Sequence, residues 1–221
     1  MPKTAKRTPS RQNEFLEVAR ALFEEKGFEN TSVDDIVTKM GVAKGLFYYY
    51  FDSKEQLLAI IFDRMIDEVH ASITAAMEGK NLTAMERFKA LMPSNSDITS
   101  RSKKLIDYFH QERNQALHFA MESRSRKFMV PAMEQVIRQG VEEGVFRTEH
   151  PRESAVALLS MLTALRHDLP PAPTAEQWYR LALVAQEFSE RLLGASPGTF
   201  DIFKESLPPE LRAVYESKKV Q

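Results

Sequence analysis

Residues 31–50 carry the most restrictive pattern in the chain, because two short helical segments and a tight turn must fit into about twenty residues. Ile36 and Val37 mark the inner face of the first segment. Gly41 is expected to end it, since glycine takes a positive φ without steric cost. The second segment carries five consecutive aromatic side chains, Phe47–Phe51. A helix, a turn and a helix of this size are typical of a helix-turn-helix, whose second helix lies in the major groove of DNA.

The five aromatic side chains are too many for one face of a helix to bury. Phe47 and Phe51 are four residues apart, so they share one face and are expected to pack beneath the motif. Burial alone explains these two phenylalanines well. It explains Tyr48–Tyr50 poorly, because three consecutive tyrosines fan over most of the helix circumference. We therefore favour DNA contact over a purely structural role for the tyrosines.

The opposite face of the second segment offers groups that suit DNA. Lys44 can donate to a phosphate or to the two major-groove acceptors of guanine. Tyr48 and Tyr49 each offer a hydroxyl group to phosphate and a ring to the methyl group of thymine. Gly45 has no side chain, which would let the helix backbone approach the floor of the groove.

Local charge supports the same interpretation, although the net charge of the whole chain is only −1. Lys6 and Arg7 belong to a basic N-terminal arm that precedes the first acidic residue and can reach along the DNA backbone. Two predicted helix starts, at Thr31-Ser32 and at Ser53-Lys54, are expected to bind phosphate.

Residues typical of helix starts and helix ends recur along the rest of the chain. The alternation of apolar and polar residues that is typical of strands is nearly absent. Pro131 and Pro151 are each expected in the first turn of a helix. The polar stretch 93–102 is the best candidate for a loop. Capping boxes are predicted by Ser or Thr followed three residues later by an acidic residue or glutamine, namely Thr31–Asp34, Ser53–Gln56, Thr83–Glu86 and Thr174–Gln177. The sequence therefore predicts an all-α protein.

At this level of detail, residues 11–58 resemble the DNA-binding domain of the TetR family of transcriptional regulators. The stretches "GFENTSVDDIVTKMGV" and "AKGLFYYYFDSKEQLL" carry the resemblance. It implies a homodimer that binds a partly palindromic operator and releases it when a small molecule binds the C-terminal domain. By position, it implies that DNA is contacted by Thr31, Ser32, Lys44, Gly45, Tyr48, Tyr49 and Lys54. Ala43 and Leu46 depart from the polar residues common in the family, so individual base contacts do not carry over.

Two domains are expected. Residues 1–55 would form a three-helix DNA-binding domain with its basic arm, and residues 56–221 a larger helical domain for effector binding and dimerisation, with a helical tail at 198–221. Helices near 151–167 and 175–193 are expected to pair with their symmetry mates, the alternative being an intramolecular core. The residues expected at that interface are Leu158, Met161, Leu162, Leu165, Trp178, Leu181, Ala185 and Phe188.

Methionine and phenylalanine are frequent in the second domain, and methionine adapts its shape to apolar ligands. Each of them is more simply explained as an ordinary core residue, and only the set suggests a pocket for a hydrophobic effector. The tentative pocket residues are Met85, Phe88, Met92, Phe109, Leu117, Met121, Met133 and Met161. His110, Glu112 and His118 resemble a set of metal ligands, but His110 and His118 are eight residues apart and need not converge, and we expect no metal and no cofactor.

Several classes of function are not supported by the sequence. The chain has no cysteine and no apolar run of the ~20 residues that a membrane span needs, so we expect a soluble cytoplasmic protein. It lacks the common nucleophile, phosphate-loop, zinc-protease and dinucleotide motifs, so we expect no enzyme. The expected function is a ligand-responsive repressor that binds operator DNA as a homodimer. The alternative is a DNA-binding protein controlled by a protein partner.

Overall fold

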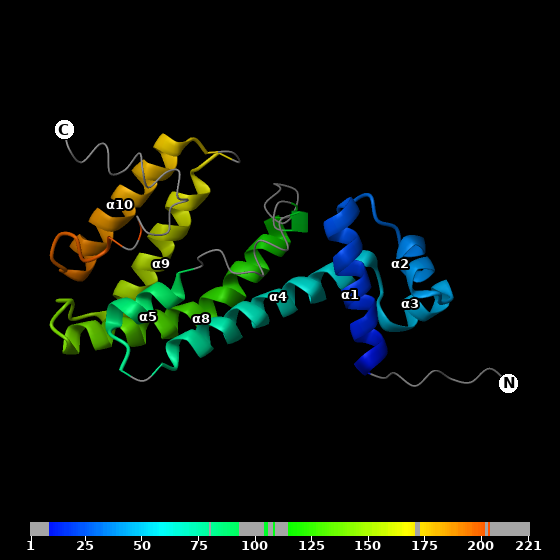
Figure 1. Cartoon of the computed structure of the whole chain (residues 1–221), viewed down its shortest axis with the longest axis horizontal. Helices are drawn as coiled ribbons and strands as arrows, with labels where there is room; N and C mark the ends of the chain where they lie inside the picture. The colour runs from blue at the N-terminus through cyan, green and yellow to red at the C-terminus, as the bar shows by residue number, and fades with distance from the viewer. Residues whose placement is uncertain are drawn as a thin grey trace. The chain divides into compact units, whose positions relative to one another are not determined.

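The computed structural model describes residues 9–79, 81–92, 104–105, 108, 115–170, 173–201 and 203, with the backbone alone at 9–10 and 115–118 (Figure 1). These residues form eight α-helices and no strand, which confirms the all-α prediction. The helices are α1 (Pro9–Lys26), α2 (Val33–Met40), α3 (Lys44–Tyr50), α4 (Lys54–Met77), α5 (Ala84–Leu91), α8 (Gln115–Glu142), α9 (Pro151–His167) and α10 (Ala175–Leu193).

The chain divides into two compact units. Unit 1 comprises the described residues of Met1–Ser72 and Asn95–Ser125, and unit 2 those of Ile73–Ser94 and Arg126–Gln221. The division falls within α4 and within α8, whereas the sequence placed a boundary at 55/56, before most of α4. The difference arises because Leu57, Leu58 and Ile61 of α4 are buried in the core of unit 1.

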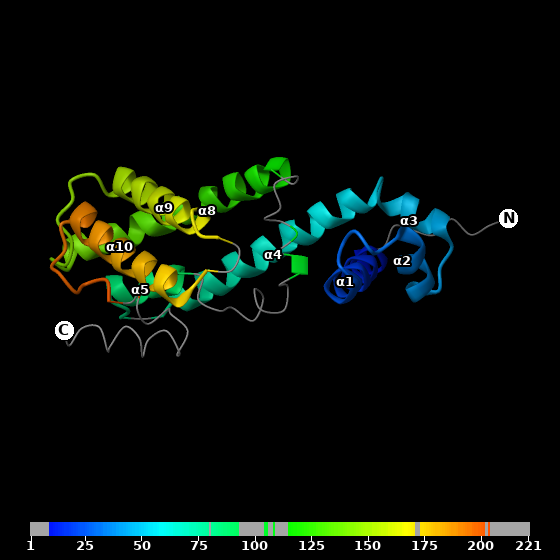
Figure 2. The same cartoon turned by 90° about the horizontal axis from the view of Figure 1, so that it is seen from above.

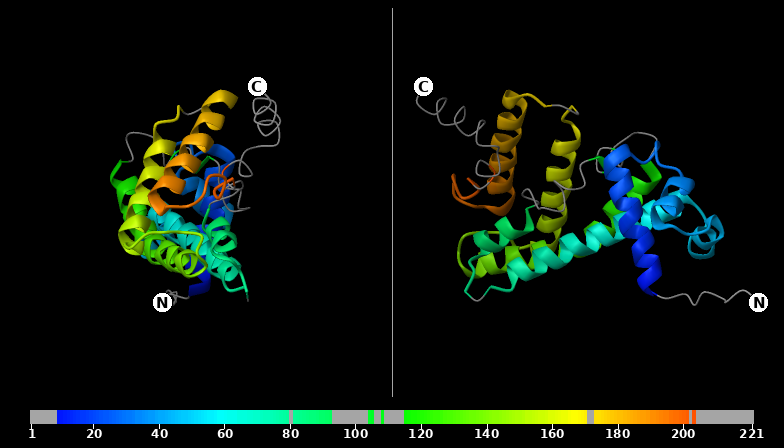
Figure 3. Two further views of the ribbon diagram at one scale, coloured as in Figure 1. Left: turned by 90° about the vertical axis from the view of Figure 1, so that its left-hand side faces the viewer. Right: turned by 45° about the vertical axis from the view of Figure 1, so that its right-hand side comes forward.

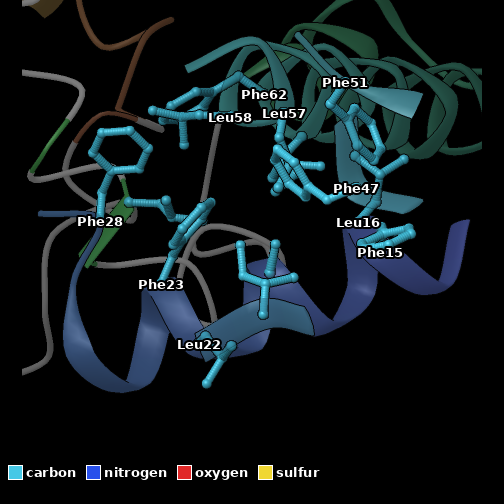
Figure 4. Packing of buried hydrophobic residues seen from close by; sticks show 14 of the residues in the cluster. Phe15, Leu16, Leu22, Phe23, Phe28, Phe47, Phe51, Leu57, Leu58 and Phe62 are labelled. Carbon is cyan, nitrogen blue, oxygen red and sulfur yellow. The ribbon is translucent and has the colours of Figure 1, made fainter. Parts of the chain in front are cut away.

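Unit 1 is built around aromatic side chains from α1 and α3 (Figure 4). Phe15 of α1 is fully buried, and its ring meets Phe47 edge-on at 5.9 Å between centroids and Phe51 at 5.7 Å. Ile36 and Val37 of α2 complete this core. The packing fixes which face of α3 points inward, because Phe47 and Phe51 are four residues apart on the same face.

The turn between α2 and α3 is made by Gly41, as the sequence predicts. Gly41 adopts the left-handed conformation, with φ 64°. Its N–H donates to Thr38 O at 3.1 Å, and the N–H of Val42 donates to Val37 O at 3.0 Å. These bonds satisfy carbonyl groups at the end of α2, which is the usual role of glycine after a helix.

Unit 2 includes α5, α9 and α10, with α9 and α10 packed side by side (Figures 2 and 3). Three phenylalanines in its core are almost fully buried. Phe88 of α5 meets Phe200 edge-on at 4.8 Å, and Phe146 stacks on Phe200 at 5.7 Å. No helix in the described part of the chain is long and apolar enough to cross a membrane.

The predicted ends of the unit 2 helices are mostly confirmed. The capping boxes Thr83–Glu86 and Thr174–Gln177 are both formed, and Gly194 ends α10 with φ 61°. The prediction for Pro131 is wrong, because this residue lies inside α8 rather than in the first turn of a helix. A proline inside a helix loses one backbone hydrogen bond. The nearby side chains of Val130 and Met133 are 7% and 0% exposed, so this part of α8 lies against the core.

Candidate nucleic-acid interface

The aromatic run of α3 divides between the core and the surface. Phe47, Tyr50 and Phe51 are buried, whereas Tyr48 and Tyr49 are 53% and 46% exposed. The sequence placed Tyr50 at the boundary of the two faces, and the structure packs its ring against Phe15 at 5.9 Å. The helix therefore has one face fixed by core packing and one tyrosine-bearing face directed to solvent.

Beside the exposed tyrosines, the first turn of α3 is open. Ala43 precedes the helix in an extended conformation and makes no side-chain cap, as its apolar side chain predicts. A Cβ atom added to Gly45 would meet no other atom within 4 Å, and the backbone there does not have a positive φ. The packing of the protein itself therefore does not require glycine at position 45.

Lys44, the first residue of α3, is held by a residue of α2. Its Nζ atom lies 2.9 Å from Oδ2 of Asp34, and the two side chains are 49% and 66% exposed. The hydrogen bond to Asp34 raises the pKa of Lys44 above its usual value. The ammonium group is thus charged at neutral pH and lies beside a carboxylate. The sequence pattern predicted a capping-box role for Asp34 and gave no sign of its contact with Lys44.

The capping box of α2 is formed one residue later than predicted, by Ser32 and Asp35. Asp35 N donates to Ser32 Oγ at 3.0 Å, while Ser32 N and Oγ donate to Asp35 Oδ2 at 2.8 and 2.7 Å. The backbone bond from Ser32, followed by its hydroxyl bond and by Lys26 at 3.1 Å, lowers the pKa of Asp35 to about 2. Ser32 is exposed, but its hydroxyl group is committed to this cap.

Thr31 has a structural role that the sequence did not indicate. Its side chain is 1% exposed, and Oγ1 donates to Gly27 O at 2.8 Å. The expectation that this hydroxyl group binds a phosphate is wrong, because the group is buried and bonded within the connection between α1 and α2. Its adjacent residue Ser32 is the helix cap, which places Thr31 one position outside the helix.

Lys54 requires a similar correction. Its Nζ atom donates to Phe28 O at 2.8 Å and to Thr31 O at 2.9 Å, and it lies 4.1 Å from the centroid of the Phe28 ring. The side chain therefore ties the start of α4 to the connection between α1 and α2. One sequence signal favoured such a role, since a cation at the N-terminus of a helix is opposed by the helix dipole and needs another partner.

The other residues predicted to bind DNA, effector, metal or a second subunit lie in both units or outside the described residues. Lys6, Arg7 and Phe109 are not among the described residues, nor are the side chains of Leu117, His110, Glu112 and His118. Met121 belongs to the core of unit 1. Within unit 2, Phe88, Met133, Leu158 and Ala185 are buried, Phe188 is exposed, and the half-buried set comprises Met85, Met92, Met161, Leu162, Leu165, Trp178 and Leu181.

Comparison with known proteins identifies the family. Residues 15–61 match the family model described as bacterial regulatory proteins, tetR family. The HTH-type transcriptional repressor KstR2 of Mycobacterium tuberculosis is 30% identical over 156 residues, which cover 67% of this chain and 76% of that protein.

Solved structures share the fold. A TetR/AcrR-family transcriptional regulator from Thermobifida fusca aligns with a TM-score of 0.58 and 26% identity, over 83% of this chain and 97% of that one. A transcriptional regulator from Cytophaga hutchinsonii aligns with a TM-score of 0.61 at 16% identity, over 84% and 97% of the two chains. Together with the helix-turn-helix of α2 and α3, these similarities show that the chain belongs to the TetR family of transcriptional regulators.

Proposed function

We propose that this TetR-family regulator is a dimeric repressor that binds a two-fold symmetric operator and releases it when a small hydrophobic molecule binds unit 2. The observation that carries the proposal is the exposed face of α3. Tyr48 and Tyr49 project into solvent from a helix that Phe47 and Phe51 anchor in the core. Repression is supported by KstR2, which is named a repressor.

The exposed face of α3 has the chemistry of a major-groove reader. Lys44 supplies a charged donor, Tyr48 and Tyr49 supply hydroxyl groups and rings, and Gly45 leaves the helix backbone open to close approach. Thr31 and Lys54 make internal contacts, and the N–H and hydroxyl groups of Ser32 both donate to Asp35. The proposed DNA-contacting set is therefore Lys44, Gly45, Tyr48 and Tyr49, together with Lys6 and Arg7 of the arm.

Dimerisation through α10 is supported by an apolar stripe beside its buried face. Ala182, Ala185, Ser189 and Leu193 face the interior of unit 2. The adjacent stripe, formed by Leu181, Val184, Phe188 and Leu192, is half-buried or exposed, with Phe188 43% exposed. A second copy of this surface would cover the stripe, and a two-fold arrangement would present two α3 helices to two half-sites.

The effector proposal rests on the burial of methionine and phenylalanine side chains in unit 2, where Met85, Met92 and Met161 are half-buried and Phe88 and Met133 are buried. Unbranched methionine side chains can rearrange around an apolar molecule at little cost. A protein partner is the second candidate for control, and the 74% exposed ring of Phe119 on α8 favours it.

Selection from a library of random DNA duplexes tests the proposal. The protein should enrich inverted pairs of half-sites whose centres lie about one helical turn apart, or a multiple of it. A variant carrying Tyr48→Ala and Tyr49→Ala is the control, because both rings lie outside the core. If the wild type enriches nothing beyond what this variant enriches, operator binding is rejected. With an operator in hand, apolar compounds that raise the melting temperature are then tested for operator release. If none releases it, control by a protein partner stands instead.

A further inference from the structure

The ion pair between Lys44 and Asp34 is an unusual feature on a surface proposed to face DNA. A carboxylate there is repelled by the phosphates, so it lowers affinity for every DNA sequence. The pair is also exposed, and exposed ion pairs contribute little to folding stability. Asp34 takes no part in the capping box, which Ser32 and Asp35 form, and at its exposed place in the first turn of α2 the helix dipole stabilises it only weakly. Folding therefore gains little from Asp34 and general affinity for DNA is lowered by it, so neither accounts for a carboxylate paired with Lys44.

The hydrogen-bonding capacity of the pair leaves specific groups unused. A lysine ammonium group has three donors, and one of those of Lys44 is taken by Oδ2 of Asp34 at 2.9 Å. Two donors remain for an external partner. The other carboxylate oxygen of Asp34, Oδ1, accepts no hydrogen bond from the residues that the structure describes. The pair thus presents two donors and one acceptor next to each other.

A G·C base pair presents the complementary set in the major groove. Guanine offers two acceptors, O6 and N7, and the cytosine paired with it offers the N4 amino group as a donor. An A·T pair presents a different order of groups, because adenine has an amino group where guanine has O6 and thymine has the acceptor O4 where cytosine has N4. A lysine fixed by a carboxylate distinguishes these patterns better than a free lysine, because a free ammonium group can turn to the nearest phosphate.

We propose that Lys44 and Asp34 act as one unit that selects a G·C base pair in each half-site of the operator. Lys44 donates to O6 and N7 of guanine. Asp34 holds Lys44 away from the phosphates and accepts from N4 of cytosine through Oδ1. Asp34 is therefore a specificity-determining residue whose presence lowers affinity for non-cognate DNA. This inference rests on the proposed operator binding and goes beyond it by naming the base pair and the residues that read it.

The test uses the operator obtained by selection, with each base pair of a half-site replaced in turn by the other three. At one position the wild type should prefer G·C by about 5- to 150-fold, the range of a good bidentate base contact. Asp34→Asn and Asp34→Ala should lose most of that preference while binding random duplexes more tightly. Lys44→Ala should lose the same preference, and replacement of that guanine by 7-deazaguanine should weaken the wild type but not Lys44→Ala.

Lys39→Ala is the matched control, because Lys39 is another exposed lysine of the same motif, with no ion pair in the described residues. It should weaken all sequences alike and leave the G·C preference unchanged. Circular dichroism melting checks that every variant is folded. If Lys44→Ala also weakens every base variant equally and lowers the salt slope by about 1, Lys44 contacts phosphate and the inference is wrong while operator binding stands. Unchanged preference in Asp34→Ala would overturn the role of Asp34. A wild type that selects no operator overturns both proposals.

Discussion

The ring of Phe146 lies against the backbone of Gly140, in the space that a side chain at position 140 would need. A Cβ atom on residue 140 would be 2.1 Å from Cδ2 and 2.4 Å from Cε2 of that ring. The N–H groups of Val145 and Phe146 both donate to Gly140 O, at 2.8 and 2.9 Å. The close approach of the ring therefore accompanies the turn that ends α8.

Gly140→Ala is accordingly expected to destabilise the protein by about 1 to 3 kcal/mol, the usual cost of overpacking. The ring cannot move away freely, because it is 1% exposed and stacks on Phe200. Urea denaturation measures the change. Phe146→Leu combined with Gly140→Ala should cost less than the sum of the two single changes, and strict additivity would show that the ring and residue 140 do not compete for space.

Gly45→Ala should have the opposite effect on stability. Its Cβ atom meets nothing within 4 Å, and alanine is favoured over glycine in a helix by up to about 1 kcal/mol. We expect an equal or higher melting temperature together with weaker operator binding, because the methyl group would separate the helix backbone from the groove floor. Thermal denaturation and operator titration measure the two quantities. Unchanged operator affinity would show that DNA does not approach the helix at this residue.

Lys54→Met is expected to lower stability by about 1 to 3 kcal/mol, because Phe28 O and Thr31 O both lose a charged donor. Lys44→Met is the control, since it removes a lysine of the same unit whose contact is exposed, and it should cost less than about 1 kcal/mol. Where the Lys54 variant remains folded, the salt dependence of operator binding should keep its wild-type slope. A clearly flatter slope of log affinity against log salt concentration would show that Lys54 contacts phosphate.

The stability that the Ser32–Asp35 cap contributes should depend on pH. Its hydrogen bonds lower the folded-state pKa of Asp35 from 3.8 to about 2, so folding favours the ionised carboxyl group. The contribution is therefore complete above about pH 4 and is lost as the pH falls through 4 toward 2. The difference in urea midpoint between the wild type and Asp35→Ala should narrow across this window. Ser32→Ala should show the same narrowing, and a difference independent of pH would argue against the cap.

Phe188→Glu should convert the dimer to monomers, because it would bury an unpaired charge in the proposed interface. Leu183→Glu is the matched control. Leu183 is 37% exposed on the same helix, five residues earlier and so about 140° around it, away from the stripe that contains Phe188. Sedimentation should show monomers with weakened operator binding for Phe188→Glu only. A wild type that sediments as a monomer at micromolar concentration would refute the proposed assembly.

Much of unit 1 could be predicted from the sequence because its helices and its turn depend on residues that are close together in the sequence. The turn at Gly41 follows from the steric freedom of glycine, and the inward face of α3 follows from the four-residue spacing of Phe47 and Phe51. The cap of α2 was placed one residue early because Thr31-Ser32 and Asp34-Asp35 offer two overlapping patterns. Only the burial of Thr31 decides between them.

Other roles depend on residues distant in the sequence. Lys54 contacts carbonyl groups 26 and 23 residues away, and Lys44 contacts a carboxylate ten residues away. A lysine near a DNA-reading helix looks the same in the sequence whether its charge is committed to the protein or free for DNA.

The sequence by itself determined the helices, the turn and the motif, because backbone preferences and helical periodicity act over a few residues. The tertiary structure decided which polar groups of that motif remain available, since burial and long-range hydrogen bonds follow from packing. Packing removed Thr31 and Lys54 from the surface proposed to face DNA, and it placed Asp34 there beside Lys44.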